Sequence, residues 1–365
     1  MQWFFDNLLP EGGVRQALAR LARLDEHDAL GLLTTYGEES AGALTLLPEE
    51  RPFPSDGSYE ALTREELRQW ANDRSTVPFL AAGGKAHMSL AGAQHKRPLH
   101  WQSGTEPSAD TLLRPRGLAS SIIVKPDNAR VELFPYCPAN EHFCMALAAR
   151  VGLDVPRTWL LHLPEPLYVV QRFDRVLLRD GRVERLHQID LCQLLNKWAG
   201  AKYEADGGIG AVEAFRALEG TRQPAVSRHR FIRWLVFNYL IGNSDAHAKN
   251  LAFLVSSDGL TVAPCYDLLS VAVYGAAYDH MAMTIADEVR YGWVERAHWD
   301  KLAAALNLRP AFLRRVASGL AQVVPSAARE VLADPAFSSD ERRFLQRVIA
   351  QIDAHARYLA AAVKR

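Results

Sequence analysis

The sequence has few cysteines, and none of them lie close together. Four occur among 365 residues, at Cys137, Cys144, Cys192 and Cys265, and no two have the Cys-x-x-Cys spacing. Structural zinc sites are commonly built from such closely spaced pairs. We therefore expect free, mostly buried thiols in a reducing cytoplasm, and we do not expect a zinc site.

The sequence also lacks net charge and long apolar runs. Lysine plus arginine and aspartate plus glutamate both total 42, so the whole chain gives no electrostatic argument for binding nucleic acid or an anionic membrane. No apolar run has the length of a membrane span, and the start, Met-Gln-Trp-Phe-Phe-Asp-Asn, has no basic signal-peptide region. With 48% hydrophobic and 23% charged residues, the composition indicates an ordinary globular protein, which we expect in the cytoplasm.

The length of the chain is sufficient for two or three packed units. Before residue 50, Asp28 is placed to cap a short helix, and Ala41 to Leu47 reads as a strand. Arg51 to Ser58 has the composition of a linker, and Thr63 to Glu66 is a capping box that opens another helix. We therefore divide the chain into an N-terminal subdomain (1–50), a linker with a short helix (51–75), a strand-rich unit (76–175) and a mostly helical unit (176–365).

The most informative stretch is Ile241 to Asn250, which follows an apolar helical pattern and precedes a short apolar strand. It contains Asp245 and, five positions later, Asn250. In the catalytic loop of a phosphotransferase, such an aspartate can orient the acceptor hydroxyl and take its proton, while the asparagine can face a magnesium ion on the phosphates. Because both residues are common in loops, a plain polar turn is an equal alternative for this stretch taken alone.

Three other residues fit the same chemistry. Lys125 lies near the end of an apolar strand, where kinases carry the lysine that holds the ATP phosphates; a solvated strand-end lysine is the alternative. Glu141, which with Asn140 is expected to cap the next helix, either stabilises the helix dipole or orients Lys125. Asp267 follows a predicted hairpin and has apolar neighbours on both sides, so its carboxylate must be paired or hold a cation.

The segment from Ser89 to Lys96 is a turn of small residues between two predicted strands. Small residues let backbone N–H groups approach phosphate oxygens. Gly92 is the only glycine in this segment, so it does not match a standard glycine-rich loop, and a plain hairpin is the alternative.

The order of these motifs is more specific than any one of them. Along the chain come the small-residue turn, the strand lysine, a helix glutamate, a linker strand, the Asp-x4-Asn loop, a hairpin and the apolar-flanked aspartate. Protein-kinase-like phosphotransferases have this order, so we predict an α+β, bilobal kinase-like fold. Many protein kinases place a lysine two residues after the catalytic aspartate. Here His247 holds that position and Lys249 comes two residues later, which puts the chain outside the main eukaryotic-type group.

With these motifs, the chain resembles the HipA family of bacterial serine/threonine kinases, the toxins of HipA–HipB toxin–antitoxin pairs. The resemblance covers nearly the whole chain. It is carried by Phe5 to Gly12, Ser89 to Gln94, Ile123 to Pro126, Asn140 and Glu141, Gln171 to Arg175, Lys202 to Gly208, Gly242 to Asn250, and Tyr266 to Leu268.

The resemblance implies a role for each matching residue. Asp245 would be the catalytic base, Asn250 and Asp267 would hold Mg²⁺, and Lys125 would hold the phosphates of ATP. The segment covering the phosphates would consist of Ala91, Gly92, Ala93, Gln94, His95 and Lys96. Adenine would lie against Gln171, Arg172 and Phe173, and the nucleotide site would be completed by His247, Lys249, Asn250, Tyr266 and Asp267.

Regulation and substrate are also implied by the family. Ser89 matches the serine that family members autophosphorylate, and a phosphate there could not share the site with the phosphates of ATP. The alternative for Ser89 is an ordinary strand-end hydroxyl. Family members phosphorylate aminoacyl-tRNA synthetases, so the expected substrate is a cytoplasmic translation protein and the expected result is growth arrest.

Two departures from the family stand out. Gln171 replaces a glutamate that many relatives carry, which changes little if the backbone alone contacts adenine. HipA proteins also usually carry a small β-rich subdomain before the stretch that matches Phe5 to Gly12, and we expect this chain to lack it. Shortened relatives, called HipT, occur with a separate small protein, HipS, that resembles the missing subdomain. We therefore expect a HipB-like helix-turn-helix antitoxin, operator DNA bound mainly through it, and a HipS-like protein docking near the apolar start at Trp3 to Phe5. The alternative for this start is that its aromatic side chains fold back onto the chain's own core.

Two alternative functions remain open at this point. A small-molecule kinase of the aminoglycoside-phosphotransferase type also carries Asp and Asn in its loop, but typically with His before Asp, whereas Ser244 precedes Asp245 here. A corepressor that binds operator DNA with an antitoxin would use basic side chains. The candidates are Arg228, Arg230, Arg314 and Arg315, for which solvated helix faces are the simpler explanation.

Overall fold

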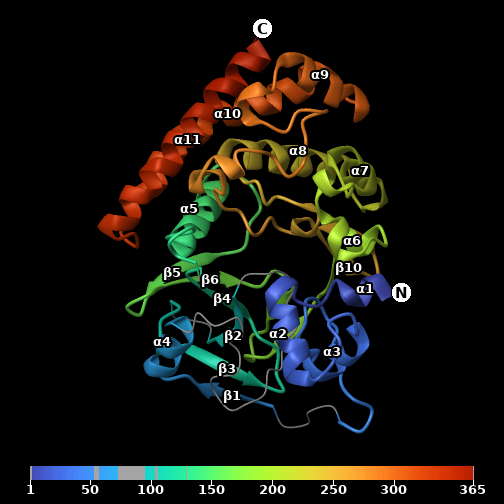
Figure 1. Cartoon of the computed structure of the whole chain (residues 1–365), viewed down its shortest axis with the longest axis vertical. Coiled ribbons are helices and arrows are strands. Elements are labelled where there is room, and N and C mark those ends of the chain that lie inside the picture. The colour runs from blue at the N-terminus through green and yellow to red at the C-terminus, as the bar shows by residue number, and fades with distance from the viewer. Residues whose placement is uncertain (1, 53–56, 73–94, 103–105, 129, 365) are drawn as a thin grey trace. The chain divides into compact units, whose positions relative to one another are not determined.

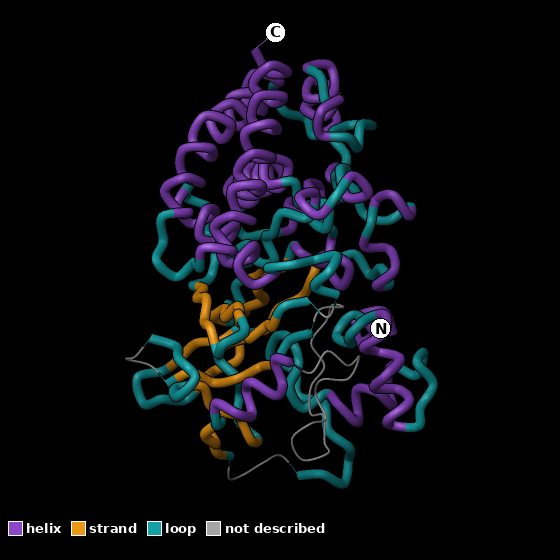
Figure 2. Tube along the Cα trace, turned by 60° about the vertical axis from the view of Figure 1, so that its left-hand side comes forward, coloured by secondary structure: helices purple, strands orange, loops and turns teal. Residues whose placement is uncertain are grey.

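The computed structural model describes residues 2–52, 57–72, 95–102, 106–128 and 130–364. The chain divides into two compact units, each built from three separate segments. Unit 1 comprises Met1–Pro138, Pro156–Ile189 and Asn196–Ala199, and unit 2 comprises Ala139–Val155, Asp190–Leu195 and Gly200–Arg365. Most strands belong to unit 1 and the long helices belong to unit 2 (Figure 1, Figure 2), as an α+β protein requires.

Unit 1 begins with three short helices, α1 (Gln2–Asp6), α2 (Gly12–Ala22) and α3 (Ala29–Tyr36). Their apolar faces share one cluster built around Leu8, Leu18 and Leu33. As predicted, Asp28 caps α3, where its carboxylate accepts a hydrogen bond from the Gly31 N–H at 2.9 Å. In the aromatic start, Phe4 and Phe5 pack against this cluster, whereas Trp3 is 41% exposed.

The prediction of a strand from Ala41 to Leu47 is wrong. Gly42 adopts a left-handed conformation with φ of 76°, and its N–H donates to the Asp174 carboxylate at 2.7 Å. The Arg175 guanidinium donates to the Gly42 carbonyl at 2.8 Å. The backbone groups that a strand would pair with a neighbour are bonded instead to buried charged side chains, which the apolar pattern of this segment does not reveal.

Those charged side chains form a buried network around Glu39. The Glu39 carboxylate lies 2.8 Å from Arg172, 3.0 Å from Arg175 and 2.6 Å from Arg185. Asp174 adds contacts to Arg172 at 2.8 Å and to Arg175 at 2.9 Å. Burial alone would raise the pKa of Asp174, but the guanidinium groups of Arg172 and Arg175 and the Gly42 N–H lower it to about 2. The network fixes the loop after α3 to the end of a strand of the sheet described next.

The centre of unit 1 is a six-stranded sheet in which every neighbouring pair is antiparallel. Its strand order is β1-β3-β2-β4-β6-β5. The strands are β1 (Ser58–Ala61), β2 (Arg97–Trp101), β3 (Leu112–Arg116), β4 (Ile122–Pro126), β5 (Thr158–His162) and β6 (Pro166–Gln171).

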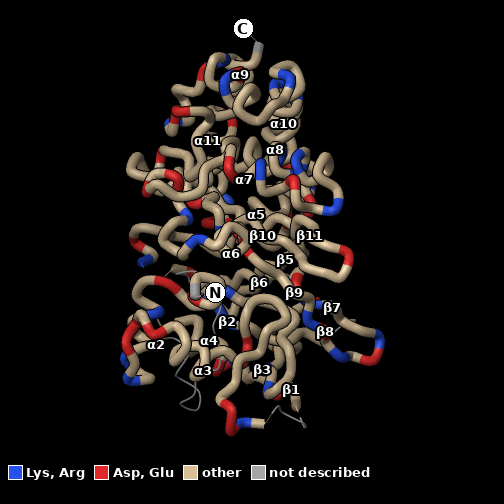
Figure 3. Tube along the Cα trace, turned by 90° about the vertical axis from the view of Figure 1, so that its right-hand side faces the viewer, with Lys and Arg blue, Asp and Glu red and all other residues tan. Residues whose placement is uncertain are grey.

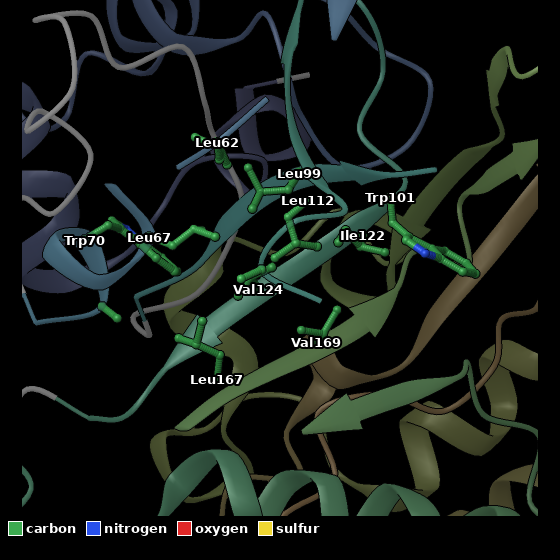
Figure 4. Close-up of a cluster of buried hydrophobic side chains, with 12 residues drawn as sticks. Leu62, Leu67, Trp70, Leu99, Trp101, Leu112, Ile122, Val124, Leu167 and Val169 are labelled. Carbon is green, nitrogen blue, oxygen red and sulfur yellow. The ribbon is translucent and has the colours of Figure 1, made fainter. Parts of the chain in front are cut away.

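One helix, α4 (Arg64–Asn72), packs on this sheet. Leu67 and Trp70 of α4 join Leu99, Val124 and other strand residues in one buried cluster (Figure 4). The predicted capping box is present, since the Glu66 N–H donates to the Thr63 hydroxyl and the Glu66 carboxylate accepts from the Thr63 N–H. After the sheet come a small hairpin of β7 (Arg175–Leu177) and β8 (Val183–Arg185), then β9 (His187–Asp190).

Unit 2 is built mainly of helices. They are α5 (Cys137–Arg150, beginning in unit 1), α6 (Leu191–Leu194), α7 (Ala211–Ala217), α8 (Pro224–Ile241), α9 (Arg296–Ala305), α10 (Pro310–Leu332) and α11 (Ser339–Lys364). Helices α10 and α11 pack along one another and both contact α8, whose Phe231, Trp234 and Phe237 are buried. The predicted hairpin is present as β10 (Ala252–Ser256) and β11 (Gly259–Val262). No helix in the described ranges is both long and apolar enough to cross a membrane.

The start of α5 differs from the prediction. Asn140 does not cap the helix, because α5 begins three residues earlier. Asp127 caps it instead, accepting from the N–H groups of Tyr136 at 3.3 Å and Cys137 at 3.0 Å. The buried Asn140 carboxamide binds the backbone of Ser270, donating to its carbonyl at 2.8 Å and accepting from its N–H at 3.0 Å.

The cysteines are as expected. Cys137, Cys144 and Cys192 are buried free thiols, and Cys265 is half-buried.

Candidate active site

The loop from Asn243 to Asn250 begins where α8 ends. Gly242 caps α8 in a left-handed conformation with φ of 68°. A Cβ atom at this position would lie 3.0 Å from the Ala272 Cβ and 3.1 Å from the His355 Cε1. Glycine is therefore required both for the backbone conformation and for the space, and it turns the chain from the buried helix into the loop.

Hydrogen bonds inside the loop fix its two informative residues relative to one another. The Asn250 side-chain amide donates to the Asp245 carbonyl at 2.8 Å, and the His247 N–H donates to the same carbonyl at 2.8 Å. The Asn250 N–H donates in turn to the His247 carbonyl at 2.9 Å. The Asp245 side chain stays 45% exposed. The loop thus holds its backbone rigidly while it presents one carboxylate to solvent.

A residue that the sequence did not single out, Asn243, links this loop to Asp267. Its carboxamide oxygen accepts from the Asp245 N–H at 3.1 Å. Its amide nitrogen donates to the Asn238 side chain at 2.8 Å and to the Asp267 carbonyl at 3.4 Å. Asp267 itself has φ of 59°, an uncommon conformation for a residue other than glycine, and such conformations often occur at functional sites.

Tyr266 adds a second link between the same two segments. Its hydroxyl donates to the Lys249 carbonyl at 2.5 Å. Unit 2 thereby brings Asp245, Asn250 and the Tyr266–Asp267 pair together, although 17 residues separate Lys249 from Tyr266 in the chain. These contacts go beyond what a plain polar turn at 241–250 would require.

Two side chains of the described residues lie next to the Asp245 carboxylate. The Tyr203 hydroxyl donates a hydrogen bond to Asp245 Oδ1. The His247 Nε2 lies 3.9 Å from the same oxygen. Sequence reasoning did not assign Tyr203 a role, because nothing in its local pattern indicates a partner 42 residues away.

Lys249 is buried, and its Nζ lies 3.7 Å from the Asp190 carboxylate. Asp190 also caps α6, where it accepts from the Gln193 N–H at 2.8 Å. Lys249 is therefore tied to the start of α6, and a contact between its ammonium group and a nucleotide stays a prediction.

The predicted residues of unit 1 lie on β4 and at the end of β6. Lys125 is 6% exposed, and its Nζ lies 5.6 Å from the centre of the Tyr168 ring. The alternative of a solvated strand-end lysine is therefore wrong. Burying an ammonium group costs free energy unless an anion or a π system compensates its charge. Burial of Lys125 therefore favours the binding of an anion such as a phosphate.

The stretch predicted to contact adenine already uses part of its backbone. The Gln171 N–H donates to the Arg157 carbonyl at 2.9 Å, and the Arg172 N–H donates to the Ser121 carbonyl at 2.9 Å. The Arg172 side chain belongs to the buried network around Glu39. Backbone recognition of adenine from this stretch would therefore not use these two N–H groups.

The remaining predicted residues belong to the phosphate-covering segment. Ser89, Ala91, Gly92, Ala93 and Gln94 lie outside the described residues. His95 and Lys96 are half-buried and come directly before β2.

The chemistry of the donors in unit 2 suits a magnesium ion that is shared with a nucleotide. Among the described residues no cluster of three His, Cys, Asp or Glu side chains could hold a metal by itself. Mg²⁺ in phosphotransferases commonly takes one or two protein oxygens and completes its shell with phosphates and water. An Asn250 carboxamide whose nitrogen is used inside the loop, together with the Asp267 carboxylate, supplies oxygen ligands of the kind Mg²⁺ prefers.

Comparisons with known proteins identify the family to which the chain is similar. The family model of the HipA-like C-terminal domain matches residues 88–328, and that of the HipA N-terminal domain matches residues 1–47. The protein Y4mE of Sinorhizobium fredii, whose name describes it as a kinase, is 34% identical over 342 residues, covering 91% of this chain and 79% of Y4mE. The serine/threonine-protein kinase toxin HipA of Shewanella oneidensis is 29% identical over 374 residues, covering 98% of this chain and 83% of that protein.

A solved structure is similar over the same length. The complex of HipA, HipB and operator DNA from Shewanella oneidensis contains a chain that superposes with a TM-score of 0.83 at 27% identity, covering 97% of this chain and 84% of that chain. The resemblance predicted from the motifs is therefore confirmed, and so is the predicted kinase-like fold. The HipT-like character of the chain stays a prediction.

Proposed function

Because the chain belongs to the HipA family of serine/threonine protein kinases, we propose that it is the toxin of a toxin–antitoxin system and transfers the γ-phosphate of ATP to a hydroxyl of a cytoplasmic protein. One observation carries this proposal. The catalytic loop holds the backbone of Asp245 through the Asn250 amide while the Asp245 carboxylate remains 45% exposed. A fixed, accessible carboxylate is what an acceptor hydroxyl needs to be oriented and deprotonated.

The proposed mechanism gives each charged group one task. Asp245 would accept the proton of the acceptor hydroxyl and aim its oxygen at the γ-phosphorus. Lys125 would neutralise charge on the phosphates. Asn250 and Asp267 would hold Mg²⁺, which when bound supplies positive charge where negative charge develops on the transferred group. Asn243 would keep the base and the metal ligand in register, since it bonds to the backbone of both.

The rest of the nucleotide-binding site would be formed by the residues that match the family motifs. The phosphates would be covered by Ala91, Gly92, Ala93, Gln94, His95 and Lys96. Adenine would contact Gln171, Arg172 and Phe173, and further contacts would come from His247, Lys249 and Tyr266. This placement rests on the match of the HipA-like C-terminal domain to residues 88–328.

The proposed substrate is a translation protein, with aminoacyl-tRNA synthetases as the first candidates, and phosphorylation of Ser89 would limit the activity. The support for a toxin role is the name of the Shewanella oneidensis relative, a serine/threonine-protein kinase toxin. A phosphate on Ser89 would compete by charge with the phosphates of ATP. Phosphoproteomics after brief expression would identify both the substrate and the state of Ser89.

The proposed partners are a HipB-like antitoxin, operator DNA bound mainly through that antitoxin, and a HipS-like small protein on the N-terminal helices. The first two are supported by the Shewanella oneidensis complex, which contains HipB and operator DNA. The third is supported by Trp3, whose side chain is 41% exposed beside an otherwise packed cluster. Co-expression with neighbouring short reading frames and recovery of a complex would test it.

A corepressor role can coexist with the kinase role, but direct DNA contacts by this chain receive little support. Arg228 pairs with Glu219, Arg314 pairs with Asp300, and Arg230 lies 2.5 Å from Asp154. In the view of Figure 3, positions of Lys and Arg are interspersed with positions of Asp and Glu. Since nearby carboxylates offset these arginines, binding to operator DNA through the antitoxin is the simpler arrangement.

The decisive experiment replaces the proposed base. We expect Asp245→Asn to lower phosphate transfer from labelled ATP to lysate proteins by at least about 100-fold, because a general base contributes about that much. Toxicity on expression should disappear with it. The control is Asp258→Asn, since Asp258 is an exposed aspartate in the turn between β10 and β11. Toxicity or phosphate transfer that survives Asp245→Asn would contradict the kinase mechanism.

A further inference from the structure

The hydrogen bond between Tyr203 and Asp245 connects two loops that are distant in the chain. Tyr203 lies between two short 3-10 turns, Ala199–Lys202 and Glu204–Asp206, and its side chain is half-buried. Its hydroxyl donates to Asp245 Oδ1. A hydrogen bond from a neutral donor to a carboxylate is stronger than one between neutral groups, so it can fix the rotation of an otherwise exposed side chain.

The Tyr203 ring is itself held in place. It packs against the buried His247 ring in a T-shaped arrangement, with a centroid distance of 4.9 Å and an interplanar angle of 80°. The Lys202 Nζ lies 5.2 Å from the ring centre. The Tyr203 carbonyl accepts from the Asp206 N–H at 3.2 Å and from the Gly208 N–H at 3.0 Å. These contacts restrict the movement of the Tyr203 side chain next to Asp245.

The next residue fastens the same loop to a third segment. The Glu204 carboxylate accepts from the Thr284 N–H at 2.6 Å and from the Thr284 hydroxyl at 3.1 Å. Two glycines make room for this arrangement. A Cβ at Gly208 would lie 2.2 Å from the Ala201 carbonyl oxygen, and a Cβ at Gly210 would lie 2.2 Å from Glu204 Oε1. The loop is thus closed tightly around Tyr203 and Glu204.

We propose that Tyr203 is a positioning residue for phosphate transfer: its hydroxyl holds Oδ1 of Asp245 so that Oδ2 faces the acceptor hydroxyl. The inference rests on the proposed function, in which Asp245 is the base. Glu204 supports it by fixing the loop that carries Tyr203.

The opposite arrangement is that the Tyr203 hydroxyl occupies the place of the acceptor hydroxyl and blocks the site. The contacts favour positioning. The ring is packed on His247, and its loop is anchored through Glu204 and closed at Gly208, whereas a blocking side chain would have to leave whenever substrate arrives. One carboxylate oxygen also suffices for the tyrosine, which leaves the other as an acceptor for substrate.

The experiment removes only the hydroxyl. We expect Tyr203→Phe to lower kcat by about 10- to 100-fold, because a small misplacement of a catalytic group has an effect of that size. The KM for ATP should change by less than about twofold, since Tyr203 is not among the proposed nucleotide contacts. The matched control is Tyr239→Phe, which removes a buried tyrosine hydroxyl that donates to the Tyr291 carbonyl at 2.6 Å. The control should lower the melting temperature and leave kcat unchanged.

Wild type, Asp245→Asn and Tyr203→Phe are assayed together so that two failures can be told apart. If wild type and Asp245→Asn transfer phosphate equally, the proposed function fails and the role of Tyr203 fails with it. If Asp245→Asn is inactive but Tyr203→Phe equals or exceeds wild type, positioning is overturned, and an excess indicates the blocking arrangement. Should Tyr203→Phe melt below the assay temperature, Glu204→Ala takes its place. A lower kcat at unchanged KM supports positioning there, and an unchanged kcat overturns it.

Discussion

At the scale of single residues, Asn243 shows why an amide and not a carboxylate occupies a key position of the loop. Its oxygen accepts from the Asp245 N–H, while its nitrogen donates to the Asn238 side chain and the Asp267 carbonyl. Only a group with both an acceptor and donors can make all three contacts. The backbones of Asp245 and Asp267 therefore depend on one carboxamide.

The first prediction concerns Asn243→Asp, which keeps the shape of the side chain and replaces its donor nitrogen with oxygen. The new oxygen would face the Asn238 oxygen and the Asp267 carbonyl, so we expect a loss of about 1–3 kcal/mol in the free energy of unfolding. Phosphate transfer should fall as well. Urea denaturation and the labelled-ATP assay measure the two effects. The control is Gln322→Glu at an exposed position inside α10, which should change stability by less than about 0.5 kcal/mol.

The second prediction concerns Gly242→Ala. The left-handed backbone and the close approach of Ala272 and His355 both oppose a Cβ at this position. We expect a loss of about 2 kcal/mol or more in the free energy of unfolding. Gly319→Ala in the interior of α10 is the matched control, because a Cβ there meets nothing within 4 Å. It should be neutral or stabilise by up to about 1 kcal/mol, and equal effects at the two positions would contradict the argument.

From the sequence, local spacing could indicate candidate site residues, but it could not indicate residues that act through long-range contacts. The Asp-x4-Asn spacing and the apolar neighbours of Asp267 indicated those residues directly, and the structure brings them together. Asn243 and Tyr203 carry no such local pattern. Their importance comes from partners 24 and 42 residues away, which become neighbours only when the chain folds.

At the scale of elements, buried charges explain where prediction from apolar patterns was wrong. Ala41 to Leu47 has the composition of a strand, but its neighbours Glu39 and Ser40 and its own Gly42 bind Arg172, Arg175 and Asp174. The cap of α5 was likewise predicted at Asn140, beside the helix, but Asp127 provides it from ten residues upstream. In both cases a side chain from elsewhere satisfied backbone groups that a local pattern had assigned to regular structure.

The third prediction concerns the acid stability of this charged network. Asp174 has a folded pKa of about 2, below its ordinary value of 3.8. The ionised form is therefore favoured by folding, so Asp174 contributes stability above pH 3.8 that is lost as the pH falls toward 2. The contribution at neutral pH is about 2 kcal/mol. Denaturant unfolding between pH 5 and pH 2 measures it. The decrease over this window should be smaller in Asp174→Asn, which removes the titrating group.

The buried residue His142 affects the free energy of unfolding in a different pH range. Burial lowers the pKa of His142 to about 4 from its ordinary 6.5. The unfolded chain therefore binds a proton at this residue first, and stability is lost as the pH falls from 6.5 to 4. We expect His142→Gln to flatten the pH dependence of stability between pH 6.5 and 4 and to leave the part below pH 3.8 unchanged. Loss of the lower part instead would contradict the assignment to Asp174.

At the scale of the whole molecule, the order of motifs was enough to predict a kinase-like fold. The motifs that build a nucleotide site follow one another in the same order in kinase-like chains. The compact units are less directly related to the order of the chain. Unit 1 and unit 2 each consist of three segments that alternate along the chain, and the division at residues 50, 75 and 175 stays a prediction.

The fourth prediction uses the whole molecule as a reporter of ligand binding. If nucleotide and magnesium bind as proposed, MgATP at about 100 times its Kd adds about 2.7 kcal/mol to the free energy of unfolding and raises the melting temperature. Chelation of the metal with EDTA should remove most of this shift. Asp267→Ala should remove it also when Mg²⁺ is present, while the Asp258→Asn control should keep it. A rise in melting temperature that persists both with EDTA and in Asp267→Ala would contradict the proposed metal ligands.

The alternation of segments has a consequence for synthesis on the ribosome. Helix α5 is complete at residue 150, but Asn140 within it binds Ser270, 130 residues further along the chain. At about 5–20 residues per second, roughly 7–26 seconds pass between the synthesis of these two residues. Throughout that interval the side chains of Phe143 and Leu147, which are fully buried in the finished protein, have no completed core to enter. The nascent chain therefore exposes apolar side chains of α5 during this interval, and transiently exposed surface of this kind is prone to aggregation.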